Sequence, residues 1–256
     1  MAYSGKVALI TGGASGMGRV AARHCSSTGA SVAILDLNEA GLEEAKAGQS
    51  DMHSFKLDIS DSAAVSEAVD KIEKDIGPID RVYNAAAIMP SAKLLDQDTS
   101  LILKMMDINY GGLVNISKAT VPKMIERGHG DFISFASMAG FCPTMYLGAY
   151  TATKFAVVAY TEVLYHENLK SGVNFACVCP PLVNTPLLEQ TKSSVWPETL
   201  KLSETLEPED VIAAIDKGID KGKFYVFPGR MTRMNVMFAK IFPKLGWNIV
   251  HRMEGF

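Results

Sequence analysis

The stretch Val7-Ala-Leu-Ile-Thr-Gly-Gly-Ala-Ser-Gly-Met-Gly18 decides the fold. Its apolar beginning predicts a buried strand, its glycines predict a tight turn, and the apolar spacing that follows predicts a helix. Glycine adopts positive φ and lets a phosphate come close to the main chain, and the first turn of a helix offers free N–H groups to that phosphate. The stretch therefore predicts a phosphate-binding turn, with an ordinary strand–helix turn as the alternative.

The bulk composition predicts one folded domain over residues 1–256. Hydrophobic residues make up 48% and charged residues 21% of the chain, as is usual for a globular protein. The net charge of -3 gives no electrostatic basis for binding nucleic acid. The four cysteines form no CxxC pair and no Cys/His cluster, so we expect reduced thiols, no metal site and a cytoplasmic protein. We expect neither a signal peptide nor a membrane-spanning segment.

Short apolar runs alternate with longer helical patterns along the chain. Helices are expected over 39–47, 63–76, 101–127 and 149–170, with a kink in the third at Pro122, and strands over 30–35, 53–57, 79–83, 130–136 and 173–179. This alternation predicts an α/β fold with a doubly wound parallel sheet flanked by helices. Ligands of such sheets bind beyond the carboxyl ends of the strands. The residues that follow strands, and so share that edge, are Gly12, Asp36, Asp58, Asn84, Ser137 and Pro180.

Asp36 indicates which dinucleotide the turn binds. It ends the second apolar run, 18 positions after Gly18. An acidic residue at about this distance accepts hydrogen bonds from the adenosine ribose and repels the 2′-phosphate of NADP. Position 15 is serine, so the turn has no cation for that phosphate. Both features favour NAD (NAD+/NADH), whereas the alternative is an aspartate that merely ends a strand.

Tyr150 and Lys154 lie four positions apart on an expected helix and so share one face. A phenol has a pKa of about 10, and a neighbouring ammonium group favours its ionised form. Reaching neutrality needs a shift of about three units, or roughly 4 kcal/mol, which the lysine and an oxidised nicotinamide together could supply. Ser137 can donate a hydrogen bond to a substrate oxygen at the same edge. Taken alone, Tyr-x-x-x-Lys is most often structural, and Ala136-Ser-Met-Ala-Gly140 does not match a serine hydrolase.

From Lys6 to Leu188 the motifs, in this order, resemble the short-chain dehydrogenase/reductase superfamily. The resemblance implies a single Rossmann-like domain in which Asn109, Ser137, Tyr150 and Lys154 are catalytic, with Asn109 serving a proton relay. It implies that the adenine lies beside Asp58 and Ile59, and that Val183 and Thr185 hold the nicotinamide carboxamide. The full set of implied cofactor residues is Gly12, Ser15, Gly16, Met17, Gly18, Asp36, Leu37, Asp58, Ile59, Asn84, Ala85, Ala86, Tyr150, Lys154, Pro180, Val183 and Thr185.

Two departures from the family pattern concern glycines. Ala86 and Pro181 stand where the family has glycine, and Pro181 leaves the path of the loop beside the nicotinamide open because proline fixes φ and lacks an N–H. The glycine-rich ending of the family is replaced by Lys223-Phe-Tyr-Val-Phe-Pro-Gly229 and a longer tail.

The implied reaction is hydride exchange between the nicotinamide and a secondary alcohol or ketone. Tyr150 would act as acid or base, Lys154 would tune it and hold the nicotinamide ribose, and Ser137 would orient the substrate oxygen. Two alternatives stay open. One is an NADPH-dependent 3-oxoacyl reductase of lipid metabolism, and the other is a catalytically idle NAD-binding sensor or scaffold.

The segments expected to contact substrate are apolar. They cover 89–90, 138–147 and about 186–205, which predicts a bulky lipophilic substrate of the hydroxysteroid or long-chain alcohol type. Ordinary loop packing is the alternative. The side chains expected to line the pocket are Met89, Met138, Phe141, Met145, Leu147, Leu187, Leu188 and Trp196.

The tail from about residue 230 to 256 is both apolar and basic, and Pro243 must break or bend any helix within it. Three interpretations compete. The tail packs on its own domain or on a partner subunit of a homodimer or homotetramer, it caps the substrate pocket, or it makes peripheral contact with a membrane surface.

Overall fold

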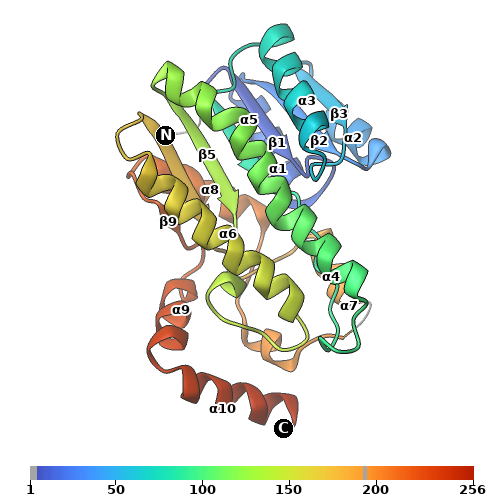
Figure 1. Cartoon of the computed structure of the whole chain (residues 1–256), viewed down its shortest axis with the longest axis vertical. Coiled ribbons are helices and arrows are strands. Elements are labelled where there is room, and N and C mark those ends of the chain that lie inside the picture. Colours follow the sequence, from blue (N-terminus) through green and yellow to red (C-terminus); the bar gives the residue numbers. More distant parts are fainter. Residues whose placement is uncertain (1–4, 193–194) are drawn as a thin grey trace.

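One parallel sheet organises the structure (Figure 1). The computed structural model describes residues 5–192 and 195–256. The strands are ordered β3-β2-β1-β4-β5-β6-β9, and each pairs with its neighbour in parallel. Their bounds are β1 Val7–Thr11, β2 Ser31–Asp36, β3 Met52–Lys56, β4 Arg81–Asn84, β5 Gly130–Phe135, β6 Val173–Val178 and β9 Tyr225–Val226. The predicted doubly wound sheet is confirmed, with β9 as an additional strand that is too short to show a periodicity.

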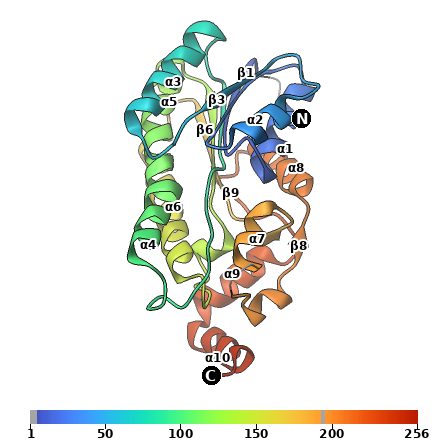
Figure 2. The same cartoon turned by 90° about the vertical axis from the view of Figure 1, so that its right-hand side faces the viewer.

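Helices cover both faces of the sheet (Figure 2). On one face, α1 (Gly16–Ser27), α2 (Glu39–Lys46) and α8 (Pro208–Ile219) bury small and aliphatic side chains such as Ala22, Leu42 and Ile215. On the other, α3 (Ser62–Asp75), α5 (Gly112–Arg127) and α6 (Gly148–Glu167) bury a second core that includes Ile72, Leu113 and Val157. The two cores explain why the central strands β1 and β2 are nearly continuous apolar runs.

The long helical pattern over 101–127 was expected to kink at Pro122, but its irregularity is a π turn about 15 residues earlier. The pattern consists of α4 (Thr99–Met106), a π turn over Asp107–Gly111 and α5, and α5 continues through Pro122. The carbonyl that Pro122 leaves unbonded belongs to Lys118, which is exposed, so water can satisfy it. The π turn contains Asn109 and turns its side chain into the core.

After β6 the chain forms short elements beside the sheet. These are β7 (Leu182–Val183), α7 (Pro186–Lys192), a 3-10 turn over Glu198–Leu202, and β8 (Thr205–Leu206), which pairs with β7. The tail forms α9 (Thr232–Ile241) and α10 (Pro243–Glu254), which extend beyond the end of the sheet in Figure 1. The break at Pro243 is as predicted. In the described part of the chain, none of the helices has the length and apolar character needed to cross a membrane.

Candidate active site

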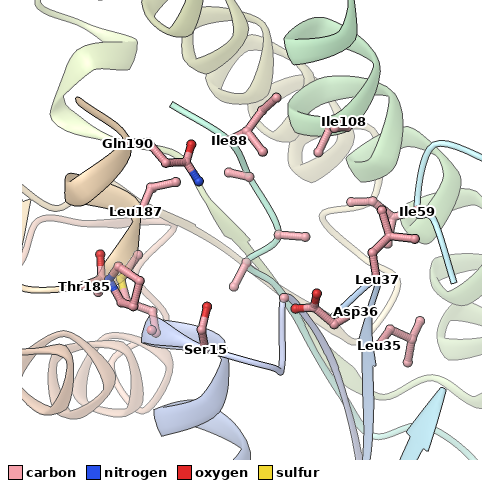
Figure 3. A pocket seen from close by; sticks show the side chains of 18 of the residues that line it. Ser15, Leu35, Asp36, Leu37, Ile59, Ile88, Ile108, Thr185, Leu187 and Gln190 are labelled. Carbon is pink, nitrogen blue, oxygen red and sulfur yellow. The ribbon is translucent and has the colours of Figure 1, made fainter. Parts of the chain in front are cut away.

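A cleft opens beyond the carboxyl ends of β1 and β4, where the strand order reverses (Figure 3). Ser15 stands at the start of α1, Leu37 and Ile59 form one side, and Thr185 and Gln190 form the other. This is the position at which open α/β sheets bind ligands. The predicted cofactor residues that line it are Gly12, Ser15, Gly16, Met17, Gly18, Asp36, Leu37, Asp58, Ile59, Ala85, Ala86 and Thr185.

The glycine turn fits a dinucleotide phosphate. Gly12 has a φ of +68°, and a Cβ there would lie 2.9 Å from the Cα of Ala86. A Cβ on Gly18 would lie 2.2 Å from the carbonyl oxygen of Gly12, so the turn closes only with glycine at that position. The side chain of Ser15 makes no capping hydrogen bond to the first turn of α1. That turn therefore presents its N–H groups to the cleft.

Asp36 holds its carboxylate in the cleft at the end of β2 (Figure 3). One carboxylate oxygen accepts a hydrogen bond of 3.2 Å from the N–H of Ala14, and the other accepts one of 2.9 Å from the N–H of Asn38. The nearby cation Arg19 is turned away, since its guanidinium donates to the carbonyl of Ala14 and to Glu44. The carboxylate of Asp36 thus faces the cleft without a cation from Arg19 beside it.

Five predicted cofactor residues lie outside the lining of the cleft. Two of them, Tyr150 and Lys154, belong to the catalytic group described below, and the other three lie behind the lining. The Asn84 side chain is buried and accepts a 3.2 Å hydrogen bond from the hydroxyl of Thr11. Val183 is buried in the core, and the carbonyl of Pro180 accepts a hydrogen bond from the N–H of Met138. Asn84 ends β4 and Pro180 follows β6, close to the positions predicted for them, whereas Val183 lies within β7. Hydrogen bonding and packing turn these groups inward.

Tyr150, Lys154 and Ser137 meet at the edge of the sheet. Lys154 is buried and donates a 2.7 Å hydrogen bond to the carbonyl of Phe135, at the end of β5. Its Nζ lies 5.5 Å from the centre of the Tyr150 ring. Ser137 accepts a 3.1 Å hydrogen bond from the N–H of Ala139 and hydrogen bonds to the Tyr150 hydroxyl. The four-residue spacing on α6 places the phenol and the ammonium side by side, as predicted.

Burial acts on these two groups in opposite directions. It raises the pKa of Tyr150 to about 12, and the hydrogen bond from Ser137 offsets only part of that rise. It lowers the pKa of Lys154 to about 8, because an ammonium loses its hydration there. Each group is therefore biased toward its neutral form by the protein alone.

Asn109 ties the π turn to the neighbouring elements. Its amide donates to the carbonyl of Ile88 and to the hydroxyl of Thr153, both at 3.0 Å, and its oxygen accepts from the N–H of Ile88 at 2.9 Å. Both amide hydrogens are used, so the side chain could hold a relay water only through its oxygen. Asn109 thereby fixes the exit of β4 against α6.

An apolar cluster surrounds Tyr150. Five of the residues predicted for the substrate pocket belong to it, together with Leu200 and Met105. Ile88 and Leu187 belong to the cluster and also line the cleft, so the two regions are continuous. The five are Met89, Leu147, Leu187, Leu188 and Trp196.

The other three residues predicted for the pocket lie outside this cluster. Met138 packs on the core between the sheet and α5 and α6. Phe141 packs its ring on Tyr225 and Phe227, at 5.6 and 5.9 Å between ring centres. Met145 is half-buried and belongs to neither cluster. The strand β9 and the residue that follows it supply the aromatic partners of Phe141, and sequence reasoning missed this packing.

The comparisons with known proteins agree with this geometry. A family model described as short chain dehydrogenase matches residues 6–196. The chain belongs to the short-chain dehydrogenase family. Its members bind a nicotinamide cofactor, and this short-chain dehydrogenase is an oxidoreductase.

Two curated relatives align with nearly the whole chain. 17-beta-hydroxysteroid dehydrogenase 13 from Rattus norvegicus is 29% identical over 258 residues, covering 98% of this chain and 84% of the relative. Epidermal retinol dehydrogenase 2 from Homo sapiens is 29% identical over 269 residues, covering 99% of this chain and 85% of the relative.

Solved structures share the fold over the same extent. A short chain dehydrogenase/reductase from Burkholderia phymatum, in complex with NAD, superimposes with a TM-score of 0.84 at 25% identity, covering 96% of each chain. A short-chain dehydrogenase from Sphingobium yanoikuyae, in complex with NADPH, has a TM-score of 0.79 at 21% identity and covers 94% of this chain and 95% of that one. The second likeness is one of fold alone.

Several residues in or beside the cleft of this short-chain dehydrogenase were not predicted individually, although some lie in the segment 186–205 that was expected to contact substrate. Gln190 accepts a 2.8 Å hydrogen bond from the N–H of Met89, which joins α7 to the exit of β4. The hydroxyl of Thr191 donates to the carbonyl of Met89 at 2.9 Å. Contacts between segments this distant in sequence leave no periodic signal, so only the structure could reveal them. The remaining unpredicted lining residues are Leu35, Leu57, Ala87, Ile88, Ile108 and Pro186.

Proposed function

We propose that this short-chain dehydrogenase oxidises a bulky lipophilic secondary alcohol, or reduces the corresponding ketone, with NAD(H). The observation that carries the proposal is the placement of Tyr150 within an apolar cluster that is continuous with the cofactor cleft. The names of the relatives, a 17-beta-hydroxysteroid dehydrogenase and a retinol dehydrogenase, refer to lipophilic alcohols and support this substrate class.

The cleft residues would hold the cofactor by complementary chemistry. The first turn of α1 suits the phosphates, the Asp36 carboxylate suits the ribose hydroxyls, and Leu37 and Ile59 offer apolar surface to the adenine. When bound, the nicotinamide exchanges a hydride with the substrate carbon and, in its oxidised form, brings a positive charge to the site.

The side chains at the end of β5 and on α6 would move the proton. Tyr150 takes the hydroxyl proton of the substrate during oxidation and returns it during reduction. Ser137 hydrogen bonds to the same oxygen, and Lys154 provides the positive charge that favours the phenolate. Asn109 acts as a positioning residue that keeps the exit of β4 and the face of α6 in register.

Catalytic efficiency should increase with the apolar size of the alcohol. Burial of extra methylene groups against the cluster around Tyr150 should raise kcat/KM by about threefold per group until the pocket is filled. The measurement is a series of secondary alcohols of growing chain length, followed by a hydroxysteroid, each with NAD. Equal efficiency for short and long members, or activity with none, would contradict the proposed substrate class.

Replacing Asp36 with alanine should shift cofactor preference toward NADP. Removal of the carboxylate ends its repulsion of the 2′-phosphate and its hydrogen bonds to the ribose, so the ratio of kcat/KM for NADP to that for NAD should rise about 100-fold. The control is Asp70→Ala, which removes an exposed carboxylate that pairs with Lys123 on α5. A wild-type preference for NADPH would overturn the NAD assignment and favour the 3-oxoacyl reductase hypothesis.

A further inference from the structure

The tail exposes an apolar face that the rest of the described chain leaves uncovered. On α9, Thr232 and Val236 are buried against the body of the protein. The opposite side of the same helix shows a stripe at helical spacing, and α10 buries none of its residues. We call these exposed side chains the tail surface: Met234, Met237, Phe238, Ile241, Leu245 and Ile249.

The segment that carries the tail surface is positively charged. Residues 229–256 contain five Lys and Arg side chains and one carboxylate, Glu254, in a chain whose net charge is -3. Within the described residues, Arg230, Arg233, Lys244 and Arg252 form no ion pair. Unpaired cations can bind anionic lipid headgroups, and the apolar and aromatic side chains beside them can enter the acyl layer beneath.

The tail is also tied to the substrate side of the active site. Glu254, at the end of α10, accepts hydrogen bonds of 2.9 Å from the N–H and the hydroxyl of Thr199. The neighbouring Leu200 belongs to the apolar cluster around Tyr150. Whatever covers the tail surface therefore lies next to the segment that encloses the proposed lipophilic substrate.

We propose that the tail surface docks on the surface of a membrane that contains anionic lipids. One face of α9 is already buried against its own domain, so the domain does not cover the exposed stripe on the opposite face. A symmetric contact between two tails would bring the cations of one copy against those of the other. The docking itself does not depend on the proposed function. Its role does rest on that function, because docking would give the enzyme access to a lipophilic substrate dissolved in the membrane.

Binding of the full chain to vesicles tests the docking without any substrate. We expect it to co-sediment with vesicles of phosphatidylcholine and phosphatidylglycerol about tenfold more strongly than with phosphatidylcholine alone, and less strongly at high salt. Failure to bind the mixed vesicles at low salt would overturn the proposal.

Substitutions on the tail surface identify the contact. Phe238→Glu/Ile241→Glu places two carboxylates on the stripe at exposed positions and should weaken binding to the mixed vesicles by about tenfold or more. The matched control is Leu95→Glu/Leu169→Glu, which alters two exposed leucines in other parts of the molecule and should bind like the wild type. Turnover of a short, water-soluble secondary alcohol should be unchanged in both variants, which shows that each is folded.

The outcomes separate the docking from the proposed function. Vesicle binding that depends on Phe238 and Ile241 supports the docking even where no lipophilic alcohol is oxidised. Equal vesicle binding by the wild type and Phe238→Glu/Ile241→Glu overturns it. It is also overturned if the wild type is an oligomer that this variant dissociates and vesicles do not bind the wild type, because a second copy then covers the tail surface.

Discussion

Replacing Tyr150 with phenylalanine is expected to lower turnover by about a thousandfold or more, while cofactor binding stays intact. The phenylalanine ring retains the packing of Tyr150 against Leu147, Leu188 and the other apolar neighbours. Only the hydroxyl is lost, and with it the proton donor and acceptor at the substrate oxygen. Steady-state kinetics measure the loss of kcat, and fluorescence titration with NADH measures the binding that should remain.

The matched control for this substitution is Tyr160→Phe on the same helix. The hydroxyl of Tyr160 lies 2.8 Å from that of Ser117, where it makes a structural hydrogen bond. Its removal should cost about 1 kcal/mol of stability and leave kcat near the wild-type value. If Tyr150→Phe keeps more than about a tenth of the wild-type rate, Tyr150 is not the acid–base group.

The order and type of the principal elements could be predicted because the sheet is parallel and buried on both faces. Strands covered on both sides are continuous apolar runs, and the helices between them show one apolar stripe each. The turn from Thr11 to Gly18 was predictable for a further reason: backbone contacts at Gly12 and Gly18 leave no space for a side chain. By contrast, β9 has two residues, Tyr225–Val226, and is held by its pairing with β6, which is a contact distant in sequence.

The candidate site was predicted best where a residue lies at the end of a strand or within two positions after it. Asp36 and Asp58 line the cleft because strand ends converge at one edge of the sheet. Sequence reasoning carries less information on the longer loops, where the position along the chain does not determine which way a side chain faces. Phe141 lies close to Ser137 in sequence and yet packs away from the pocket on Tyr225, because β9 supplies an aromatic surface there.

Burial raises the pKa of Tyr150 and lowers that of Lys154, so the site needs a further positive charge to favour the phenolate. A buried phenol with a pKa of about 12 is a weak source of phenolate at neutral pH. A lysine with a pKa of about 8 is largely charged below that pH and loses its charge above it. The positive charge of an oxidised nicotinamide would favour the phenolate further. Lys154 is the part of this arrangement that mutation can remove.

Replacing Lys154 with methionine should lower the rate of alcohol oxidation by about 100-fold at neutral pH. Oxidation requires the phenolate, so its rate rises with pH as Tyr150 ionises. Without the neighbouring cation the phenol ionises less readily, and the rise should move to higher pH. The measurement is kcat/KM for oxidation from neutral to alkaline pH, with Lys170→Met, an exposed lysine beyond the end of α6, as the control.

Stability separates this loss of activity from unfolding. The pKa of Lys154 in the folded protein, about 8, lies below the ordinary value of 10.5, so keeping the buried ammonium charged at neutral pH opposes folding. In the wild type, the contribution of Lys154 to the free energy of unfolding increases as pH rises from about 8 toward 10.5, because only the unfolded state still binds the proton there. Lys154→Met removes that pH dependence along with the buried charge. Urea unfolding should therefore show no loss of stability at neutral pH while oxidation is slow, and an unchanged pH profile would show that Lys154 does not tune Tyr150.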